Sequence, residues 1–330
     1  MDAPAIATAR PRVLVTRRWP APVEARLAER FDAEFNRADR PMSRAELRAA
    51  LGRFDALLPT VTDTLDAEAL DVSRPKTRLL ANYGVGFSHI DADSARAHGI
   101  TVSNTPDVLS ECTADLALTL MLMVARRAGE GERELRAGAW TGWRPTHLVG
   151  TKVSGKTLGI VGFGRIGQAV AQRARHGFGM TVLVQNRSPV PADVLARCGA
   201  VQVDKLDALL PQCDFVSLHC PGGAVNRHLI GERRLALMKP GAFLVNTARG
   251  EVIDEDALAR ALTAGALGGA ALDVFDGEPR IAPVLLECPN LVMLPHLGSA
   301  TRETREAMGL RVIDNVTDFF DGRAPRDTVL

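Results

Sequence analysis

The sequence predicts an α/β protein made of two domains, each built on a doubly wound parallel sheet. Short runs of β-branched residues and leucine alternate with helical patterns along the chain, as they do in βαβ units. Most of these runs are apolar throughout, which is typical of strands covered by helices on both faces. The chain has 330 residues, a length that favours two domains over one.

The first series of predicted strands lies in the N-terminal third of the chain. Its strands are expected at residues 12–16, 55–59, 78–82 and 100–103. The segments between them have helical spacing and begin with Ser or Asp, as at residues 43–52 and 91–98. This alternation of strand and helix predicts a first parallel sheet.

A long helix is predicted next, at residues 107–127. Its middle is apolar on nearly all sides, which indicates a buried helix. Residues 129–154 then show no clear period, and we interpret them as an extended arm. The arm carries Trp140 and Trp143, which would favour aggregation unless another molecule covered them. We therefore expect a homodimer whose contact surface is built on the second domain and the arm.

The second series of strands begins after Lys156. Its strands are expected at residues 157–162, 180–185, 200–203, 215–219, 242–246, 268–274 and 291–294. A helical pattern at residues 301–320 closes the chain.

Charge and cysteine content exclude several classes of protein. Forty basic residues stand against 39 acidic ones, a net charge of +1, which argues against a nucleic-acid partner or a polybasic membrane anchor. Five cysteines without a CxxC motif indicate neither a disulfide framework nor a zinc site, and no cluster has metal-ligand spacing. The N-terminus has no apolar signal segment, and no apolar run is long enough to span a bilayer. We expect a cytoplasmic protein with no metal and no membrane partner.

Residues 157–171 combine a strand, a GxGxxG loop and a helix. Gly162 permits the tight turn, Gly164 lets the backbone approach a pyrophosphate, and Gly167 lets the helix pack closely on the strand. The helix N-terminus offers unpaired N–H groups and a partial positive charge to the phosphates. The context of strand, turn and helix gives this short motif its meaning and predicts a dinucleotide cofactor.

The ribose-reading position follows the next strand, after Val184. An acidic residue there would bind a free 2′-hydroxyl and repel a 2′-phosphate, but the chain has Gln185, Asn186, Arg187 and Ser188. Arg187 and Ser188 can donate hydrogen bonds to a phosphate. The predicted cofactor is therefore NADP, with NADPH preferred. The alternative is that Arg187 points to solvent and the protein uses NAD as well.

Three further motifs follow strand-like runs in the second domain. They are VNTARG at residues 245–250, ALDVFDGEP at 271–279 and LPHLGSAT at 294–301. Together with NYGVG at 82–86 and the Gly-rich loop, they resemble the D-isomer-specific 2-hydroxyacid dehydrogenase family. The resemblance extends from about Arg12 to Phe320.

Two segments are most similar to one branch of this family, the glyoxylate/hydroxypyruvate reductases, which include 2-ketogluconate reductases. These segments are residues 140–145 of the arm and residues 185–188. The family architecture implies a discontinuous substrate-binding domain, residues 1–104 with 297–330, and a Rossmann domain at 105–296 that binds NAD(P). It also implies an active site in the cleft between the two domains.

The resemblance implies a role for each residue of a catalytic trio. Arg249 matches the arginine that grips the substrate carboxylate and keto oxygen, for which a planar guanidinium is suited. His296 matches the general acid that protonates the nascent alkoxide, and Glu278 matches the carboxylate that orients the imidazole and favours its protonated form. Val85 and Gly86 match a loop whose N–H groups hold the substrate carboxylate.

The predicted binding residues outside the trio lie mainly at strand ends. Asp273 matches a residue that contacts the nicotinamide carboxamide, and Trp143, rather than Trp140, is expected to border the neighbouring subunit's site and its substrate. The predicted cofactor-binding residues are Thr113, Gly162, Phe163, Gly164, Arg165, Ile166, Gly167, Asn186, Arg187, Ser188, His219, Cys220, Pro221, Thr247, Ala248, Arg249, Asp273, His296 and Gly298.

The expected function is NADPH-dependent reduction of a small 2-oxo acid, such as glyoxylate or hydroxypyruvate, to a D-2-hydroxy acid. One alternative is a dehydrogenase for another 2-hydroxy acid, such as 2-ketogluconate or D-glycerate phosphate. Another is a nicotinamide-sensing co-regulator of the same fold. Formate dehydrogenase is disfavoured because those family members replace the glutamate that is present here as Glu278. Residues 222–226 depart from the Thr-containing sequence usual in the family, so a hydrogen bond to the cofactor is missing or replaced there.

Overall fold

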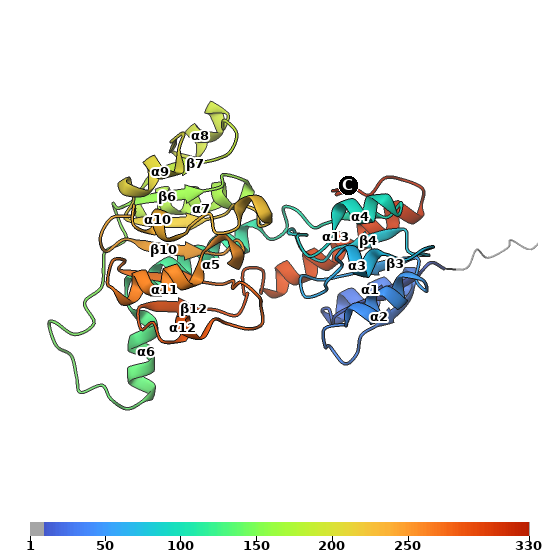
Figure 1. Cartoon of the computed structure of the whole chain (residues 1–330), viewed down its shortest axis with the longest axis horizontal. Helices are drawn as coiled ribbons and strands as arrows, with labels where there is room; N and C mark the ends of the chain where they lie inside the picture. Colours follow the sequence, from blue (N-terminus) through green and yellow to red (C-terminus); the bar gives the residue numbers. More distant parts are fainter. Residues whose placement is uncertain (1–9, 330) are drawn as a thin grey trace, which may run out of the picture. The chain divides into compact units, whose positions relative to one another are not determined.

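The computed structural model describes residues 10–329, and its contacts divide the chain into two compact units (Figure 1). The first unit comprises the residues up to Leu109 and those from Thr301 onward, and the second comprises Ser110–Ala300. The junctions between these contact-defined units, 109/110 and 300/301, lie a few residues after the domain boundaries that we expect at 104/105 and 296/297. Hydrogen bonds explain the difference, since the Thr105 N–H donates to Gly84 in the first unit and the Gly298 N–H to Asp273 in the second.

The first unit contains a five-stranded parallel sheet of order β2-β1-β3-β4-β5. Its strands are β1 (Arg12–Val15), β2 (Asp32–Phe35), β3 (Ala56–Leu58), β4 (Leu79–Ala81) and β5 (Thr101–Ser103). This is the flavodoxin-like strand order, with its switch point between β1 and β3. Strand β2 was not predicted, because it is a partly exposed edge strand of sequence DAEF without an apolar run.

Five helices flank this sheet, and most begin at a side-chain cap. They are α1 (Ala21–Arg30), α2 (Arg44–Leu51), α3 (Ala67–Leu70), α4 (Ala92–Ala97) and α13 (Arg302–Phe320). Ser43 and Glu46 form a reciprocal capping box at α2, while Asp66, Asp91 and Thr301 cap α3, α4 and α13. Helix α13 packs on α1 and β4, so the end of the chain completes the unit that its beginning starts.

The second unit contains a seven-stranded parallel sheet of order β12-β11-β10-β9-β6-β7-β8. Its strands are β6 (Thr157–Val161), β7 (Thr181–Gln185), β8 (Ala200–Gln202), β9 (Phe215–Leu218), β10 (Phe243–Asn246), β11 (Gly269–Leu272) and β12 (Leu291–Met293). This is the Rossmann order, which reverses direction between β6 and β9. Dinucleotides bind at the carboxyl ends of the strands at such a switch point.

Helices cover both faces of the second sheet. One face carries α5 (Ser110–Ala125) and α7 (Arg165–Phe178), and the other carries α10 (Glu232–Leu235), α11 (Glu255–Thr263) and α12 (Pro283–Leu286). The short helices α8 (Ala192–Cys198) and α9 (Leu206–Leu209) flank β7 and β8. Four of the five cysteines, all but Cys112, are buried as thiols. No helix among residues 10–329 is long and apolar enough to cross a membrane.

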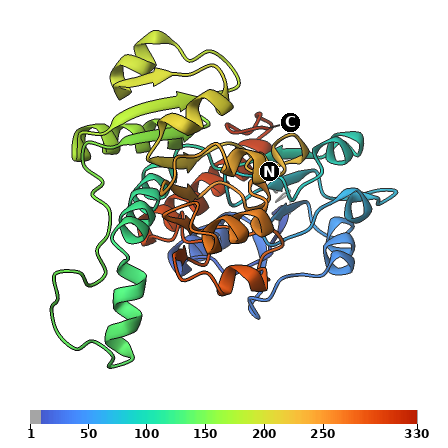
Figure 2. The same cartoon turned by 60° about the vertical axis from the view of Figure 1, so that its left-hand side comes forward.

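The arm corrects one prediction. Its first part forms a helix, α6 (Ala128–Arg136), where no periodic structure was expected. The helix buries none of its residues, so its sequence has no apolar stripe to reveal it. Ion pairs along the helix, Arg127 with Glu130 and Arg136 with Glu132, stabilise it instead. Residues 137–154 contain no helix or strand and project with α6 away from the sheet of this unit (Figure 2).

Candidate active site

The predicted trio lies at one edge of the second sheet. Arg249 follows β10, Glu278 follows β11, and His296 follows β12. These three strands are parallel neighbours, so their carboxyl ends bring the three side chains to the same edge. A positive charge, a carboxylate and an imidazole thereby come together, although their residues are well separated along the chain.

His296 and Glu278 form a hydrogen-bonded pair. Nδ1 of His296 lies 2.8 Å from Oε2 of Glu278, and the Phe275 N–H donates to the other carboxylate oxygen at 2.9 Å. Because the carboxylate accepts at Nδ1, the proton belongs there and Nε2 remains to exchange a proton with a substrate. Burial raises the pKa of Glu278, but His296, the Phe275 N–H and the charge of Arg249 outweigh it and hold the pKa below its usual value.

Asp273 fixes the loop that carries His296. Its two carboxylate oxygens accept the N–H groups of Leu297 and Gly298 at 2.7 and 2.8 Å, and its carbonyl accepts the His296 N–H at 2.9 Å. His296 itself has a φ of +57°, a left-handed conformation that these bonds maintain. Thr113, from α5, donates to the Gly298 carbonyl at 3.0 Å. Burial raises the pKa of Asp273, and the two loop N–H groups oppose that rise.

Arg249 is half-buried, with most of its donors unused. Within residues 10–329 its guanidinium makes one hydrogen bond, from Nη1 to the Ala248 carbonyl at 2.6 Å. Burial lowers the pKa of Arg249, and the charges of Glu278 and Glu251 only partly oppose that shift. The remaining N–H groups can take a carboxylate in a bidentate contact.

Glu251 was missed by the sequence analysis, although it directly follows the VNTARG motif at residues 245–250. Its Oε1 accepts the Gly223 N–H at 2.5 Å, which ties the segment after Pro221 to the arginine loop. A Cβ on Gly222 would come within 2.4 Å of this oxygen and 2.9 Å of the Arg249 Cγ. Glycine at 222 therefore lets the segment that departs from the family pattern pack against the arginine.

The Gly-rich loop connects β6 to α7 as expected. Gly162 has a φ of +90°, and a Cβ there would lie 2.6 Å from the Cys220 nitrogen. A Cβ on Gly167 would lie 2.4 Å from the Gly162 carbonyl, whereas one on Gly164 would meet nothing within 4 Å. The N-terminus of α7 and the open space at Gly164 fit a pyrophosphate.

The segment after β7 is held to the Gly-rich loop by Asn186. Its Oδ1 accepts the Phe163 N–H at 3.1 Å, and its Nδ2 donates to the Ser188 carbonyl at 3.0 Å. Arg187 and Ser188 are exposed, and no carboxylate stands at residues 185–188. The turn therefore offers a cation and a hydroxyl where many dinucleotide folds offer an acid.

Other predicted cofactor residues lie after β9 and β10. Burial lowers the pKa of His219 to about 4, and its Nε2 lies 2.8 Å from the Ser217 hydroxyl, so the ring is neutral at neutral pH. Burial raises the pKa of the Cys220 thiol to about 11, which makes it unreactive. Thr247 is buried, and within residues 10–329 its hydroxyl has no hydrogen-bond partner. Such an orphaned hydroxyl at a strand end fits a polar group of a bound nicotinamide cofactor.

Comparison with known proteins decides the family. Residues 118–298 match the model of the D-isomer specific 2-hydroxyacid dehydrogenase NAD-binding domain. The chain belongs to this family. The resemblance inferred from the motifs is thus confirmed, as is the two-domain α/β fold.

Relatives of this dehydrogenase match over nearly their whole length. The chain is 43% identical over 324 residues to glyoxylate reductase from Thermococcus litoralis, covering 97% of each protein. It is 38% identical to glycerate dehydrogenase from Hyphomicrobium methylovorum, covering 94% of this chain and 96% of the relative. A solved structure of NADPH-dependent glyoxylate/hydroxypyruvate reductase from Sinorhizobium meliloti, in complex with NADP and malonate, is 33% identical, with a TM-score of 0.86 and 97% of both chains covered.

The remaining predicted residues of this dehydrogenase lie away from the trio's strands. Val85 and Gly86 belong to the first unit, in the loop after β4. Trp143 lies in the arm of the second unit with 82% of its surface exposed. No group of three or more potential metal ligands is present among residues 10–329.

Proposed function

We propose that this dehydrogenase reduces glyoxylate, hydroxypyruvate or a related small 2-oxo acid to the D-2-hydroxy acid, with NADPH as the preferred cofactor. The observation that carries the proposal is the His296–Glu278 pair beside Arg249 at the strand ends that follow the Gly-rich loop. The names of the glyoxylate reductases at 40–43% identity support the choice of substrate.

The side chains supply three functions that reduction of a 2-oxo acid requires. Arg249 binds the carboxylate and polarises the keto oxygen, because its unused N–H donors are planar and permanently charged. His296 gives the proton on Nε2 to the oxygen as negative charge develops there, and Glu278 stabilises the imidazolium until that transfer. Asp273 keeps the histidine loop in place through its two N–H contacts. The nicotinamide, when bound, supplies the hydride, and the Gly-rich loop, Asn186–Ser188 and Thr247 would hold the cofactor.

The preference for NADPH rests on the turn after β7. Because no carboxylate stands at residues 185–188, nothing there repels a 2′-phosphate. Arg187 and Ser188 offer hydrogen-bond donors to that phosphate. The Sinorhizobium meliloti relative carries NADP in its complex, which supports the same choice.

A panel of 2-oxo acids assayed with NADPH and NADH tests the function. Glyoxylate and hydroxypyruvate should show the highest kcat/KM, and 2-ketogluconate a lower one. Activity on none of them, with cofactor binding retained, would favour the nicotinamide-sensing alternative. A higher kcat/KM on hydroxypyruvate than on glyoxylate would favour a substrate preference like that named for the glycerate dehydrogenase relative, because hydroxypyruvate is the 2-oxo acid that corresponds to glycerate.

We also propose that two copies of the chain assemble through the arm and the second unit. Helix α6 buries no residue, and Trp140, Trp143 and Val149 expose 50%, 82% and 64% of their surfaces. Several large apolar side chains exposed on one projecting segment are typical of a surface that binds another protein.

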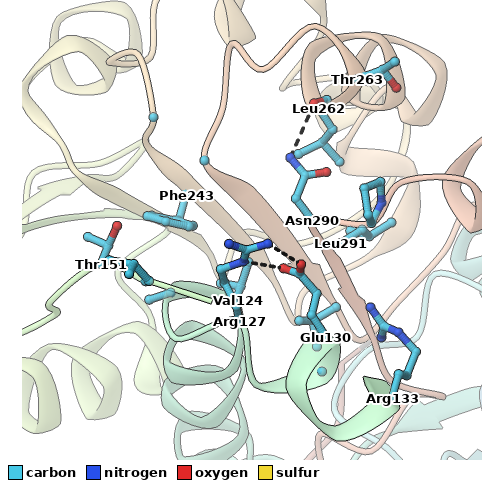
Figure 3. Close-up of a pocket in the computed structure, with 18 of the residues that line it drawn as sticks. Val124, Arg127, Glu130, Arg133, Thr151, Phe243, Leu262, Thr263, Asn290 and Leu291 are labelled. Atoms are coloured by element: carbon cyan, nitrogen blue, oxygen red, sulfur yellow. Dashed lines mark hydrogen bonds and ion pairs between the residues drawn. The ribbon is translucent and has the colours of Figure 1, made fainter. Parts of the chain in front are cut away.

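The second unit offers a receptor for such a contact. A cavity of about 630 Å³ opens between the end of α5, helix α6 and the amino ends of the sheet strands. Val124, Phe243 and Leu291 form apolar walls, while the Arg127–Glu130 ion pair and Arg133 stand on its α6 side (Figure 3). We assign it to the arm of a second copy. Light scattering at micromolar concentration should give the dimer mass, and a monomer mass would reject the assignment.

A further inference from the structure

Three consecutive carbonyl groups of the loop after β4 accept hydrogen bonds from asparagine amides. Nδ2 of Asn82 donates to the carbonyls of Gly84 and Gly86 at 2.8 and 3.0 Å. Nδ2 of Asn104 donates to the carbonyl of Val85, between them, at 2.8 Å. Both asparagines are buried, with 1% and 7% of their surfaces exposed. Two buried side chains therefore fix the orientation of three successive peptide planes.

The direction of the N–H groups follows from this arrangement. In a trans peptide the carbonyl and the next residue's N–H point in opposite directions. The carbonyls of Gly84, Val85 and Gly86 turn toward the asparagines, so the N–H groups of Val85, Gly86 and Phe87 turn away from them. Within residues 10–329 no group accepts a hydrogen bond from these three N–H groups. Successive unpaired N–H groups that share a direction form a site for an anion such as a carboxylate.

Asn104 is in turn held by the end of the chain. Its N–H donates to the Asp327 carbonyl at 3.1 Å, and its carbonyl accepts Nδ2 of Asn315 at 3.1 Å. The Asp327 carboxylate forms a two-pronged ion pair with Arg311 at 2.5 and 2.9 Å and accepts Nδ2 of Asn315 at 3.2 Å. Asp327 and Asn315 are both buried. The connection runs from helix α13 through Asp327 and Asn104 to the loop carbonyl, entirely within the first unit.

We propose that Asn82 and Asn104 are positioning residues that orient the loop N–H groups toward the substrate carboxylate, and that Asp327 acts on substrate affinity through Asn104. This inference rests on the proposed function, since it assigns a 2-oxo acid carboxylate to the loop. Neither asparagine touches the substrate in this scheme. They act by removing the alternative peptide orientations, in which a carbonyl would face the anion and repel it.

The test compares N104A with N36A in the full-length enzyme. Asn36 is a matched control, because its amide, like that of Asn104, donates to backbone carbonyls of the first unit, in this case those of Thr16 and Arg40. N104A should raise KM for the 2-oxo acid about tenfold, as expected for loss of an aligned charge-assisted contact, with kcat and NADPH affinity little changed. N36A should leave KM as in the wild type. Oxamate, a carboxylate-bearing analogue, should bind N104A with cofactor about tenfold more weakly by calorimetry.

A second variant decides the question if N104A does not fold. D327N keeps the shape of the side chain but removes the charge that pairs with Arg311, and it should raise KM about threefold with kcat retained. An unchanged KM in a folded N104A or D327N, or an equal rise in N36A, would overturn the inference. Wild-type enzyme that reduces no 2-oxo acid would instead reject the proposed function, and oxamate binding to the variants would still report on the loop.

Discussion

The Nδ1 atom of His296 lies 2.8 Å from Oε2 of Glu278, and the second oxygen of that carboxylate accepts the Phe275 N–H. The glutamate is thus anchored on one side and orients the imidazole on the other. It has a single position from which to stabilise a protonated ring.

Substituting E278Q should change the pH dependence of reduction. The pKa of Glu278 lies below its usual value beside His296, so its carboxylate is negative throughout the neutral range and stabilises positive charge on the acid. A neutral amide lacks this charge, so the fall in reduction rate toward high pH should begin at lower pH in E278Q. Steady-state rates between pH 5 and 9, with saturating cofactor, measure the shift. Profiles that superimpose would remove Glu278 from this role.

Substituting R249A should abolish most catalysis and spare cofactor binding. Loss of a bidentate charged contact at the reacting group costs several kcal/mol, which corresponds to about a thousandfold in kcat/KM. Fluorescence titration with NADPH should give a Kd close to that of the wild type. R233A is the control, since Arg233 is an exposed arginine of the same unit, paired with Asp207, and should keep full activity. Near-normal activity of R249A would mean that another group holds the carboxylate.

Substituting R187A should weaken NADPH and leave NADH almost unchanged. Only the 2′-phosphate loses a partner, and a charged contact of this kind is worth about 1.5–3 kcal/mol, or one to two orders of magnitude in affinity. R197A, which removes an exposed arginine from α8, should affect neither cofactor. The comparison needs kcat/KM for both cofactors in all three proteins. A wild-type enzyme that uses NADH as well as or better than NADPH contradicts this interpretation of the turn.

Substituting D63N should change how stability depends on pH. Asp63 is fully buried; Oδ2 accepts from Thr16 and Thr60, while Oδ1 has no partner within residues 10–329. Burial raises the pKa of Asp63, with these donors opposing the rise. A raised folded-state pKa means that stability is lost as pH rises above the ordinary carboxyl range. The wild type should therefore lose stability relative to D63N between pH 4 and pH 7, as measured by urea unfolding at both values. If the difference in unfolding free energy between the wild type and D63N is the same at both pH values, the pKa of Asp63 is not raised.

The sequence predicted those parts of the molecule that local patterns specify. The Gly-rich loop and the three motifs after it each join a strand to a particular residue type, and the parallel sheet then brings their ends to one edge. Strand β2 and helix α6 were missed because neither buries a regular apolar face. The contacts of Asn104 with Asp327 and Asn315 were also beyond prediction, since they join residues more than 200 positions apart and no short motif records them.

The discontinuity of the first unit has a consequence for synthesis. Helix α13 supplies part of this unit's core, and a Cβ on its Gly309 would lie 2.5 Å from Val23 of α1, so the two helices meet without space to spare. The residues that form α13 follow all of the second unit in the sequence. During synthesis, the second unit can therefore fold while the first unit still lacks the helix that packs on α1 and β4. The part of the first unit that precedes the second unit in the sequence therefore gains its contacts with α13 only after the whole second unit has been made, and until then the apolar face of α1 lacks that partner.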